Sequence, residues 1–196
     1  MIVHFVNFVY NNFMKTILYD LFDIIKTVLI VLVIFFASRY FLVQPFVVEG
    51  HSMDPNFSDQ EYLLVNRLSY RISTPKRGDV VVFKAPSNPQ YDYIKRVIGL
   101  PGETVVIKDN HIYVNGQIIQ EDYLAADTQT LIKNSKTATL EITLNNDEYF
   151  VLGDNREHSS DSREWGVLPK NMIIGKAWLS IYPWKTFGFI PSVSYI

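Results

Sequence analysis

The hydrophobic positions are unevenly spread along the chain, and the longest uncharged apolar segment lies close to the N-terminus. Thr27–Ser38 carries no charged residue, and Lys26 and Arg39 stand at its two ends. Extended to Ile24–Val43, the segment reaches about twenty residues, the length that an α-helix needs to cross a bilayer. A buried core helix would show a polar stripe, whereas this segment is apolar all round. Residues 24–43 are therefore predicted to form a single transmembrane helix.

The flanks of this segment favour an uncleaved signal-anchor over a removable signal peptide. The region before it carries Asp20 and Asp23, and no small-x-small cleavage site follows promptly, unlike the pattern of a cleaved signal peptide. Pro45 is expected to stop the helix, because a proline pushes the residue before it out of the α region. Met1 and Met14 both remain open as the start of the protein.

Beyond Pro45 the pattern changes to short β-branched runs separated by turn residues, which is typical of strands. Asn115-Gly116, between two such runs, indicates a two-residue hairpin turn. Tyr123–Lys133 has weak helical periodicity. Residues 44–196 are predicted to form one mainly β domain with a β-barrel-like or folded-sheet architecture. The predicted strands are Tyr62–Asn66, Asp79–Lys84, Tyr93–Ile98, Thr104–Lys108, His111–Val114, Gln117–Ile119, Glu148–Leu152 and Ile174–Ile181.

Composition and charge narrow the possible functions. The chain has 196 residues, of which 48% are apolar and 19% charged, and its net charge is -2. This balance argues against a nucleic-acid binder, which needs a basic surface. The absence of cysteine excludes disulfide scaffolds, cysteine-ligated zinc and cysteine nucleophiles. The four histidines show no metal-ligand spacing, so we expect neither a metal nor another cofactor.

The segment Gly50-His51-Ser52-Met53-Asp54-Pro55 is the first with candidate chemistry. A serine in a turn bounded by glycine and proline exposes its hydroxyl together with free backbone N–H groups. A nucleophilic serine needs both, because the tetrahedral oxyanion must meet preset donors. The alternative is an ordinary serine in a turn.

The segment Tyr93-Ile94-Lys95-Arg96-Val97 is the second. In a strand, Lys95 points with Tyr93 and Val97, and Arg96 points the other way. Desolvation on an apolar face lowers the pKa of a lysine, so that it can serve as a general base. The alternative is an exposed Lys-Arg pair.

The segment Gly153–Gly166 is the third, and it is dense in short polar residues. Such residues suit a loop held by internal hydrogen bonds, braced by bidentate contacts between Asp and Arg. The alternative is a polar surface loop. A Ser–His–Asp set of Ser52, His158 and Asp161 competes with a serine–lysine pair.

Taken together, these segments resemble the bacterial type I signal peptidases, the membrane-anchored Ser-Lys proteases that release exported proteins from their signal peptides. The resemblance runs from about Ile24 to Phe189, and the short Thr104–Glu148 region resembles the compact members. The matching motifs are Ser52-Met53-Asp54-Pro55, Arg77–Phe83, Tyr93–Gly102 and Gly153–Gly166.

The resemblance implies a role for each matching residue. Ser52 would be the nucleophile and Lys95 its general base, and the Ser52 N–H would donate to the oxyanion. The family's second donor is a serine at the position of Gly50, which has no side chain. The second donor would therefore be either a backbone N–H or a water molecule.

Four further residues match supporting positions of the family. Ser159 corresponds to the serine that orients the lysine. Asp161 and Arg163 correspond to an ion pair that braces the site, and Asp154 corresponds to a further structural acid.

The resemblance also implies the substrate, the partners and the location. Shallow apolar pockets would accept small side chains at the first and third positions before the cut in a preprotein's signal peptide. Residues 1–23 would be cytoplasmic and residues 44–196 extracytoplasmic, in contact with the lipid bilayer and within reach of the export machinery. The remaining alternative is a membrane-anchored module that binds peptides without cleaving them. The residues expected to line the pockets are Phe46, Val48, Met53, Tyr93 and Ile94.

Overall fold

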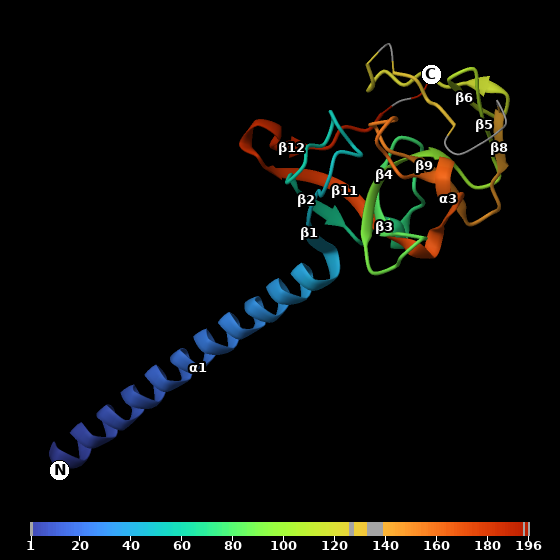
Figure 1. The fold of residues 1–196 in the computed structure, drawn as a ribbon. Coiled ribbons are helices and arrows are strands. Elements are labelled where there is room, and N and C mark those ends of the chain that lie inside the picture. The colour runs from blue at the N-terminus through green and yellow to red at the C-terminus, as the bar shows by residue number, and fades with distance from the viewer. Residues whose placement is uncertain (1, 126–127, 133–138, 194, 196) are drawn as a thin grey trace. The chain divides into compact units, whose positions relative to one another are not determined.

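The computed structural model describes residues 2–125, 128–132, 139–193 and 195. The chain divides into two compact units, Met1–Leu42 and Val43–Ile196. The first unit is one helix, α1 (Ile2–Leu42), shown in blue in Figure 1. Every side chain from Met14 to Phe36 on this helix is exposed. No helix in the described part of the chain has both the length and the apolarity of a membrane span.

The helix ends slightly earlier than predicted. Residues 24–42 lie within α1, but Val43 already begins a strand. Pro45 lies inside that strand and pairs with Leu64. The strand is at the edge of its sheet, where a proline is tolerated because one side of the strand needs no hydrogen-bond donor.

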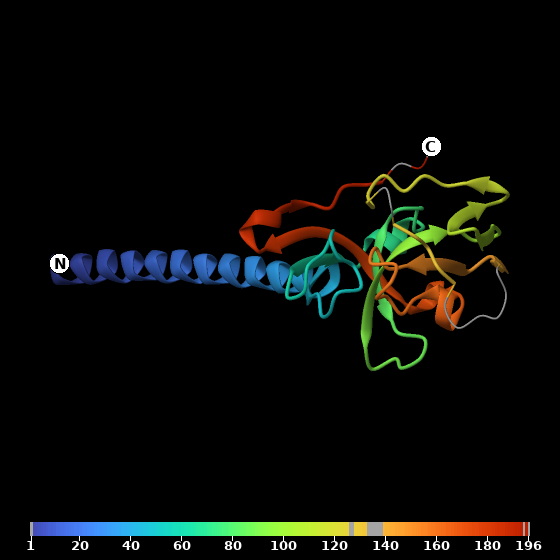
Figure 2. The same ribbon diagram turned by 45° about the horizontal axis from the view of Figure 1, so that its top comes forward.

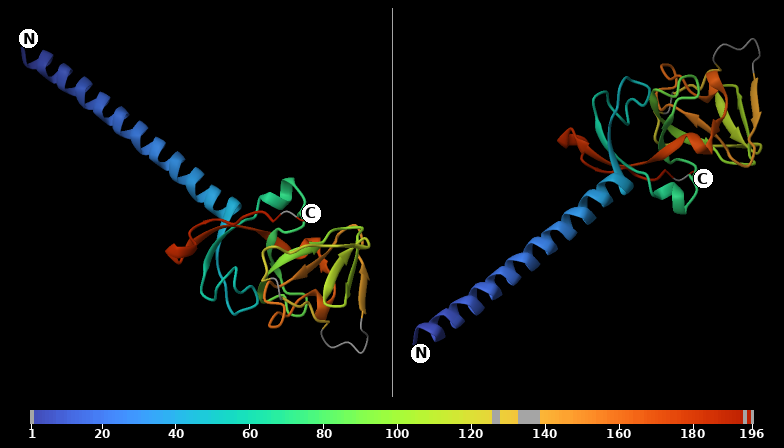
Figure 3. Two further views of the ribbon diagram at one scale, coloured as in Figure 1. Left: turned by 90° about the horizontal axis from the view of Figure 1, so that it is seen from above. Right: turned by 90° about the horizontal axis from the view of Figure 1, so that it is seen from below.

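The second unit is built from two antiparallel sheets (Figures 1 and 2). The larger sheet has eight strands in the order β1-β2-β11-β3-β4-β9-β10, with β12 paired to β11. Figure 3 shows β11 and β12 as a red hairpin. The strands are β1 (Val43–Val47), β2 (Tyr62–Asn66), β3 (Val80–Lys84), β4 (Asp92–Gly99), β9 (Glu148–Leu152), β10 (Leu168–Pro169), β11 (Ile173–Tyr182) and β12 (Gly188–Phe189).

The smaller sheet has four strands in the order β7-β6-β5-β8. Its hairpin turn at Asn115 and Gly116 has φ values of 51° and 79°, as a type I′ turn requires. The predicted hairpin is therefore confirmed. The strands are β5 (Thr104–Lys108), β6 (His111–Val114), β7 (Gln117–Ile118) and β8 (Thr139–Thr143).

Short helical turns complete the second unit. Two are α-helical, α2 (Ser69–Ile72) and α3 (Ser162–Trp165), and two are 3-10 turns, η1 (Lys170–Met172) and η2 (Trp184–Thr186). The weak helix expected at Tyr123–Lys133 is wrong for the described part of that range, which is irregular, and Lys133 lies outside the described residues. Polar contacts to a buried arginine hold this segment in place of helical hydrogen bonds.

The mainly β fold class is confirmed, and every predicted strand is present with its ends moved by at most one residue. The strands missed by the sequence pattern are β1, β8 and the two-residue β10 and β12. One apolar cluster joins β4 and β9 to the smaller sheet, and a second lies below the turn that carries Ser52. The second cluster consists of Val48, Met53, Phe57, Leu63, Val80 and Ala177.

Candidate active site

Ser52 and Lys95 are in direct contact. Ser52 lies in the turn between β1 and β2, and Lys95 lies in β4. Lys95 Nζ donates to Ser52 Oγ at 2.7 Å and to the carbonyl oxygen of Ile94 at 2.8 Å. The lysine is 3% exposed, so the amine and the hydroxyl meet in a site that excludes most water.

Burial lowers the pKa of Lys95 to about 8, because removal from water disfavours the ammonium form. The carboxylates of Asp161 and Asp154 act in the opposite direction. Each of these carboxylates is paired with a buried arginine, which offsets its charge. A large share of the amine is therefore neutral at mildly alkaline pH.

Asp161 and Arg163 form a fully buried bidentate ion pair. Arg163 Nη2 donates to Asp161 Oδ2 at 2.7 Å, and Nε donates to Oδ1 at 2.8 Å. Asp161 also caps α3 and accepts the backbone N–H of Gly153 at 3.1 Å. The pair thus ties the start of α3 to the end of β9.

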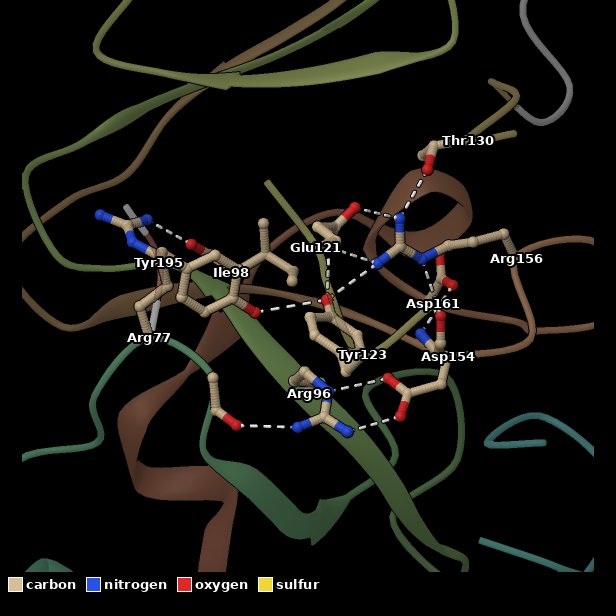
Figure 4. A network of polar contacts seen from close by, with 12 residues as sticks. Arg77, Arg96, Ile98, Glu121, Tyr123, Thr130, Asp154, Arg156, Asp161 and Tyr195 are labelled. Atoms are coloured by element: carbon tan, nitrogen blue, oxygen red, sulfur yellow. Dashed lines mark hydrogen bonds and ion pairs between the residues drawn. The ribbon is translucent and has the colours of Figure 1, made fainter. Parts of the chain in front are cut away.

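Asp154 is held by Arg96, the neighbour of Lys95 on β4 (Figure 4). Arg96 Nε and Nη2 donate to the two carboxylate oxygens at 2.9 and 2.6 Å. Asn56, from the turn that carries Ser52, donates to the same carboxylate at 2.9 Å. Asp154 is the structural acid expected from the sequence, but neither of these partners was expected.

A third buried arginine, Arg156, lies two residues after Asp154 and was not expected from the sequence. It donates to both oxygens of Glu121 at 2.7 and 2.5 Å and to Thr130 Oγ1 at 2.5 Å (Figure 4). It also donates from Nε to the carbonyl oxygen of Gly153 at 3.0 Å. Tyr123 joins the network through its hydroxyl, which donates to Glu121. The available sequence signal was a second arginine within the polar loop after β9.

Ser159 and Gly153 fit tightly together behind Ser52. Ser159 is 0% exposed. A Cβ added to Gly153 would lie 2.1 Å from Ser159 Oγ and 2.4 Å from the carbonyl oxygen of Ser52. Both distances are far below van der Waals contact, so only glycine fits here.

The alternative triad of Ser52, His158 and Asp161 lacks the hydrogen bonds that a triad needs in the described part of the chain. His158 is exposed and its Nδ1 lies 3.3 Å from Asn155 Oδ1. Asp161 is engaged with Arg163. In the described part of the chain, no hydrogen bond joins Ser52, His158 and Asp161 into a triad.

A cavity of about 490 Å³ opens beside Ser52 and Lys95. The expected pocket residues Phe46, Val48, Tyr93 and Ile94 line it. Met53 does not line it, because its side chain turns into the core, where it is 0% exposed. The other lining residues are Val47, Glu49, Gly50, His51, Leu63, Val82, Gln90, Tyr91, Asp92, His158 and Ser160.

Gly50 has a positive φ of 86°, which favours glycine over residues with a side chain. Its N–H donates to Asp59 Oδ1 at 2.7 Å. Among the residues whose placement is described, no cluster of three or more His, Cys, Asp or Glu side chains is arranged to hold a metal ion.

Comparison with known proteins places this chain in a family. Residues 21–182 match the sequence model of "Signal peptidase, peptidase S26". The chain belongs to this family, and its enzymatic class is that of the signal peptidase I proteases, which are hydrolases.

Two signal peptidases I from Bacillus species agree with this assignment. A signal peptidase I of Bacillus caldolyticus is 42% identical over 77% of this chain and 86% of its own. A signal peptidase I of Bacillus amyloliquefaciens is 38% identical over 83% of this chain and 89% of its own. A crystal structure of a signal peptidase I from Enterococcus faecalis V583 is 38% identical, with a TM-score of 0.45, and the match covers 53% of this chain and 97% of that chain.

Proposed function

We propose that this chain is a serine endopeptidase that removes N-terminal signal peptides from exported preproteins, with Ser52 as the nucleophile and Lys95 as the general base. The observation that carries the proposal is the 2.7 Å contact between Lys95 Nζ and Ser52 Oγ. A weak alcohol nucleophile needs a base within hydrogen-bond reach, and Lys95 is the group in contact with this hydroxyl.

In the first half of the reaction, neutral Lys95 accepts the hydroxyl proton of Ser52 while Oγ attacks the scissile carbonyl carbon. The carbonyl oxygen becomes an oxyanion, and the backbone N–H of Ser52 donates to it. When the tetrahedral intermediate collapses, Lys95 returns the proton to the leaving amine. The products are the released mature protein and an acyl-enzyme ester on Ser52.

In the second half, a water molecule replaces the amine. Lys95 accepts a proton from the water as it attacks the ester, and the collapse of the second intermediate returns the proton to Ser52 Oγ. The signal peptide then leaves with a new carboxylate. Lys95 thus ends each cycle neutral, as its lowered pKa of about 8 allows at mildly alkaline pH.

Three buried groups support this chemistry in the proposal. Ser159 orients the amine of Lys95. The ion pair of Asp161 and Arg163 fixes the loop after β9, and Asp154 fixes the same loop through Arg96. These residues hold the loop in place and take no part in making or breaking the scissile bond. Removing one partner of a buried ion pair would leave an uncompensated charge in the loop.

The cavity beside Ser52 supports a preference for small side chains. Phe46, Val48 and Ile94 give the cavity an apolar wall next to Ser52 and Lys95. The signal peptide would lie extended along β1 and β4 and gain backbone hydrogen bonds, as added strands do. Large side chains would clash in shallow pockets, so we expect cleavage after a small-x-small sequence, typically Ala-x-Ala.

We further propose that the chain is anchored in the cell membrane by residues 24–43 as a single-pass segment. The uncharged apolar composition of Thr27–Ser38 supports an anchor of this kind. Residues 1–23 would then be cytoplasmic and the peptidase unit extracytoplasmic, where exported preproteins present their cleavage sites. Protease added outside spheroplasts should digest the peptidase unit, and protection of that unit while an external marker is cut would show the opposite orientation.

The function is tested by incubating the full chain in detergent with a preprotein whose signal peptide ends in Ala-x-Ala. Sequencing the new N-terminus should place the cut directly after this motif. Ser52→Ala should give no product while it still binds the preprotein. If the wild-type chain binds the preprotein and leaves it intact, the protein is a peptide-binding module and the proposal is wrong.

A further inference from the structure

We propose that Asn155 is a positioning residue that sets the direction of the Ser52 N–H, the group that receives the oxyanion. The inference rests on the proposed serine-protease function and adds a residue to it. It starts from two hydrogen bonds by which one asparagine holds the carbonyl groups on both sides of the nucleophile's Cα.

The side chain of Asn155 makes the first of these bonds. Its Nδ2 donates to the carbonyl oxygen of His51 at 2.9 Å. The backbone makes the second, because the N–H of Asn155 donates to the carbonyl oxygen of Ser52 at 3.1 Å. The same residue therefore contacts the peptide group before Ser52 and the peptide group after it. The carbonyl oxygen of His51 also accepts the N–H of Asp54, at the longer distance of 3.3 Å.

Peptide geometry converts the first bond into a statement about the oxyanion donor. The peptide between His51 and Ser52 is planar and trans, so the carbonyl of His51 and the N–H of Ser52 point in opposite directions. Holding that carbonyl toward Asn155 turns the Ser52 N–H away from it. Within the described part of the chain this N–H has no acceptor, so it is available for a ligand.

The loop that carries Asn155 is itself held on both sides. On one side, Asp154 is clamped by Arg96 at 2.6 and 2.9 Å. On the other, Arg156 bonds the carbonyl oxygen of Gly153 and the carboxylate of Glu121. A preset donor is effective because no reorganisation is needed during the reaction, and this loop supplies the rigidity that such presetting requires.

The direction of the Ser52 N–H is more important because position 50 is a glycine. A side-chain donor is absent there, and the Gly50 N–H is used by Asp59. Because no side chain at position 50 can donate to the oxyanion, the Ser52 N–H must point accurately toward it. Asn155 sets that direction from a different loop.

The test compares Asn155→Ala with the wild-type full chain in detergent, using an Ala-x-Ala preprotein. We expect kcat to fall about 30- to 100-fold, somewhat less than the loss of an oxyanion donor itself. KM should stay within about threefold, because ground-state binding does not use this donor. The midpoint of the rise of kcat with pH should not move, because the contacts of Lys95 are intact.

Glu157→Ala is the matched control, since Glu157 lies on the same loop, is exposed, and makes no hydrogen bond or ion pair to another described residue. It should cleave like the wild type. If Asn155→Ala proves unfolded by thermal melting, Asn155→Leu has a similar size, carries no charge, has no side-chain donor, and should show the same loss of kcat.

Two results would overturn the inference while the proposed function stands. One is a kcat of the Asn155 variant within about threefold of the wild type. The other is a loss that lies in KM or in a shifted pH midpoint, which would mean that the loop had moved as a whole. Failure of the wild type and of Glu157→Ala to cut the preprotein would instead contradict the proposed function.

Discussion

Lys95 and Arg96 are neighbours on β4 whose side chains fix two different parts of the site. Lys95 Nζ lies 2.7 Å from Ser52 Oγ, and Arg96 holds both carboxylate oxygens of Asp154 at 2.9 and 2.6 Å. Because side chains alternate along a strand, a single central strand positions the proposed base and also anchors the loop that follows β9.

The buried amine should make stability depend on pH. The pKa of Lys95 is about 8 in the folded chain, below its unfolded value of about 10.4. Between these values the unfolded chain binds more protons, so the free energy of unfolding rises with pH, and below pH 8 the wild type carries a cost of about 3 kcal/mol. Lys95→Met removes this cost, so it should gain most relative to the wild type at pH 6.5. Urea unfolding at pH 6.5 and 9.5 checks this, and a stability difference independent of pH would contradict it.

Breaking the Arg96–Asp154 pair should affect both stability and activity. Arg96→Met leaves the Asp154 carboxylate buried and unpaired, which costs about 3–5 kcal/mol. The uncompensated carboxylate also stabilises the ammonium of Lys95, so the pH at which kcat is half-maximal should rise. Adding Asp154→Asn to Arg96→Met removes the charge and should return the midpoint toward that of the wild type. An unchanged midpoint in the single variant would show that Asp154 does not influence the base.

Gly153 should tolerate no side chain. In Gly153→Ala the new methyl group would overlap Ser159 Oγ and the carbonyl oxygen of Ser52, at 2.1 and 2.4 Å. The loop after β9 must then move away from the nucleophile, and kcat should fall by about 100-fold or more, as misplacement of about 1 Å can cost. Gly116→Ala is the control for activity, because a Cβ at Gly116 meets no atom within 4 Å and strains only its own hairpin turn, where φ is 79°. A Gly153→Ala enzyme with wild-type kcat would contradict the tight fit.

The aromatic side chains near the C-terminus are expected to contact lipid. Trp and Tyr collect at membrane interfaces, and the C-terminal aromatic run is exposed. The exposed fractions are 39% for Trp178, 51% for Tyr182, 78% for Trp184, 58% for Phe187 and 69% for Phe189. A chain beginning at Gln44, without α1, should still bind liposomes weakly. Replacing Trp184 and Phe187 by serine should abolish this binding. A folded chain from Gln44 that does not sediment with liposomes would rule the contact out.

The sequence predicts most of the strands because their β-branched runs and turn residues are local signals. It misses β1, whose Pro45 looks like a break, and β8, whose alternation is short. Both depend on pairing with distant strands, Tyr62–Asn66 for β1 and Thr104–Lys108 for β8. Pairing between segments far apart in the chain leaves no local pattern to read.

The candidate site also has features that the sequence predicts and features that it does not. Strand alternation alone separates Lys95 from Arg96, but the partner of Lys95 was reached only through resemblance to a family. The contacts of Arg156 with Glu121 and Thr130 span 35 and 26 positions, and the hydrogen bond from Asn155 to His51 spans 104. No residue spacing predicts such pairs. Met53 was misplaced because a turn, unlike a strand, gives no rule for which side chain faces the core.

The central claim is that Lys95, and no histidine, is the base for Ser52. The most direct measurement is kcat for preprotein cleavage across pH 6 to 10 by the wild type, Lys95→Ala, Lys95→Arg and His158→Ala. We predict a rise in the wild type with its midpoint at about 8, no activity in Lys95→Ala because alanine has no amine, none in Lys95→Arg because guanidinium stays protonated, and a near-normal profile for His158→Ala. A wild-type profile centred near pH 6.5, as for an ordinary histidine, together with cleavage by Lys95→Ala and none by His158→Ala, would contradict the account.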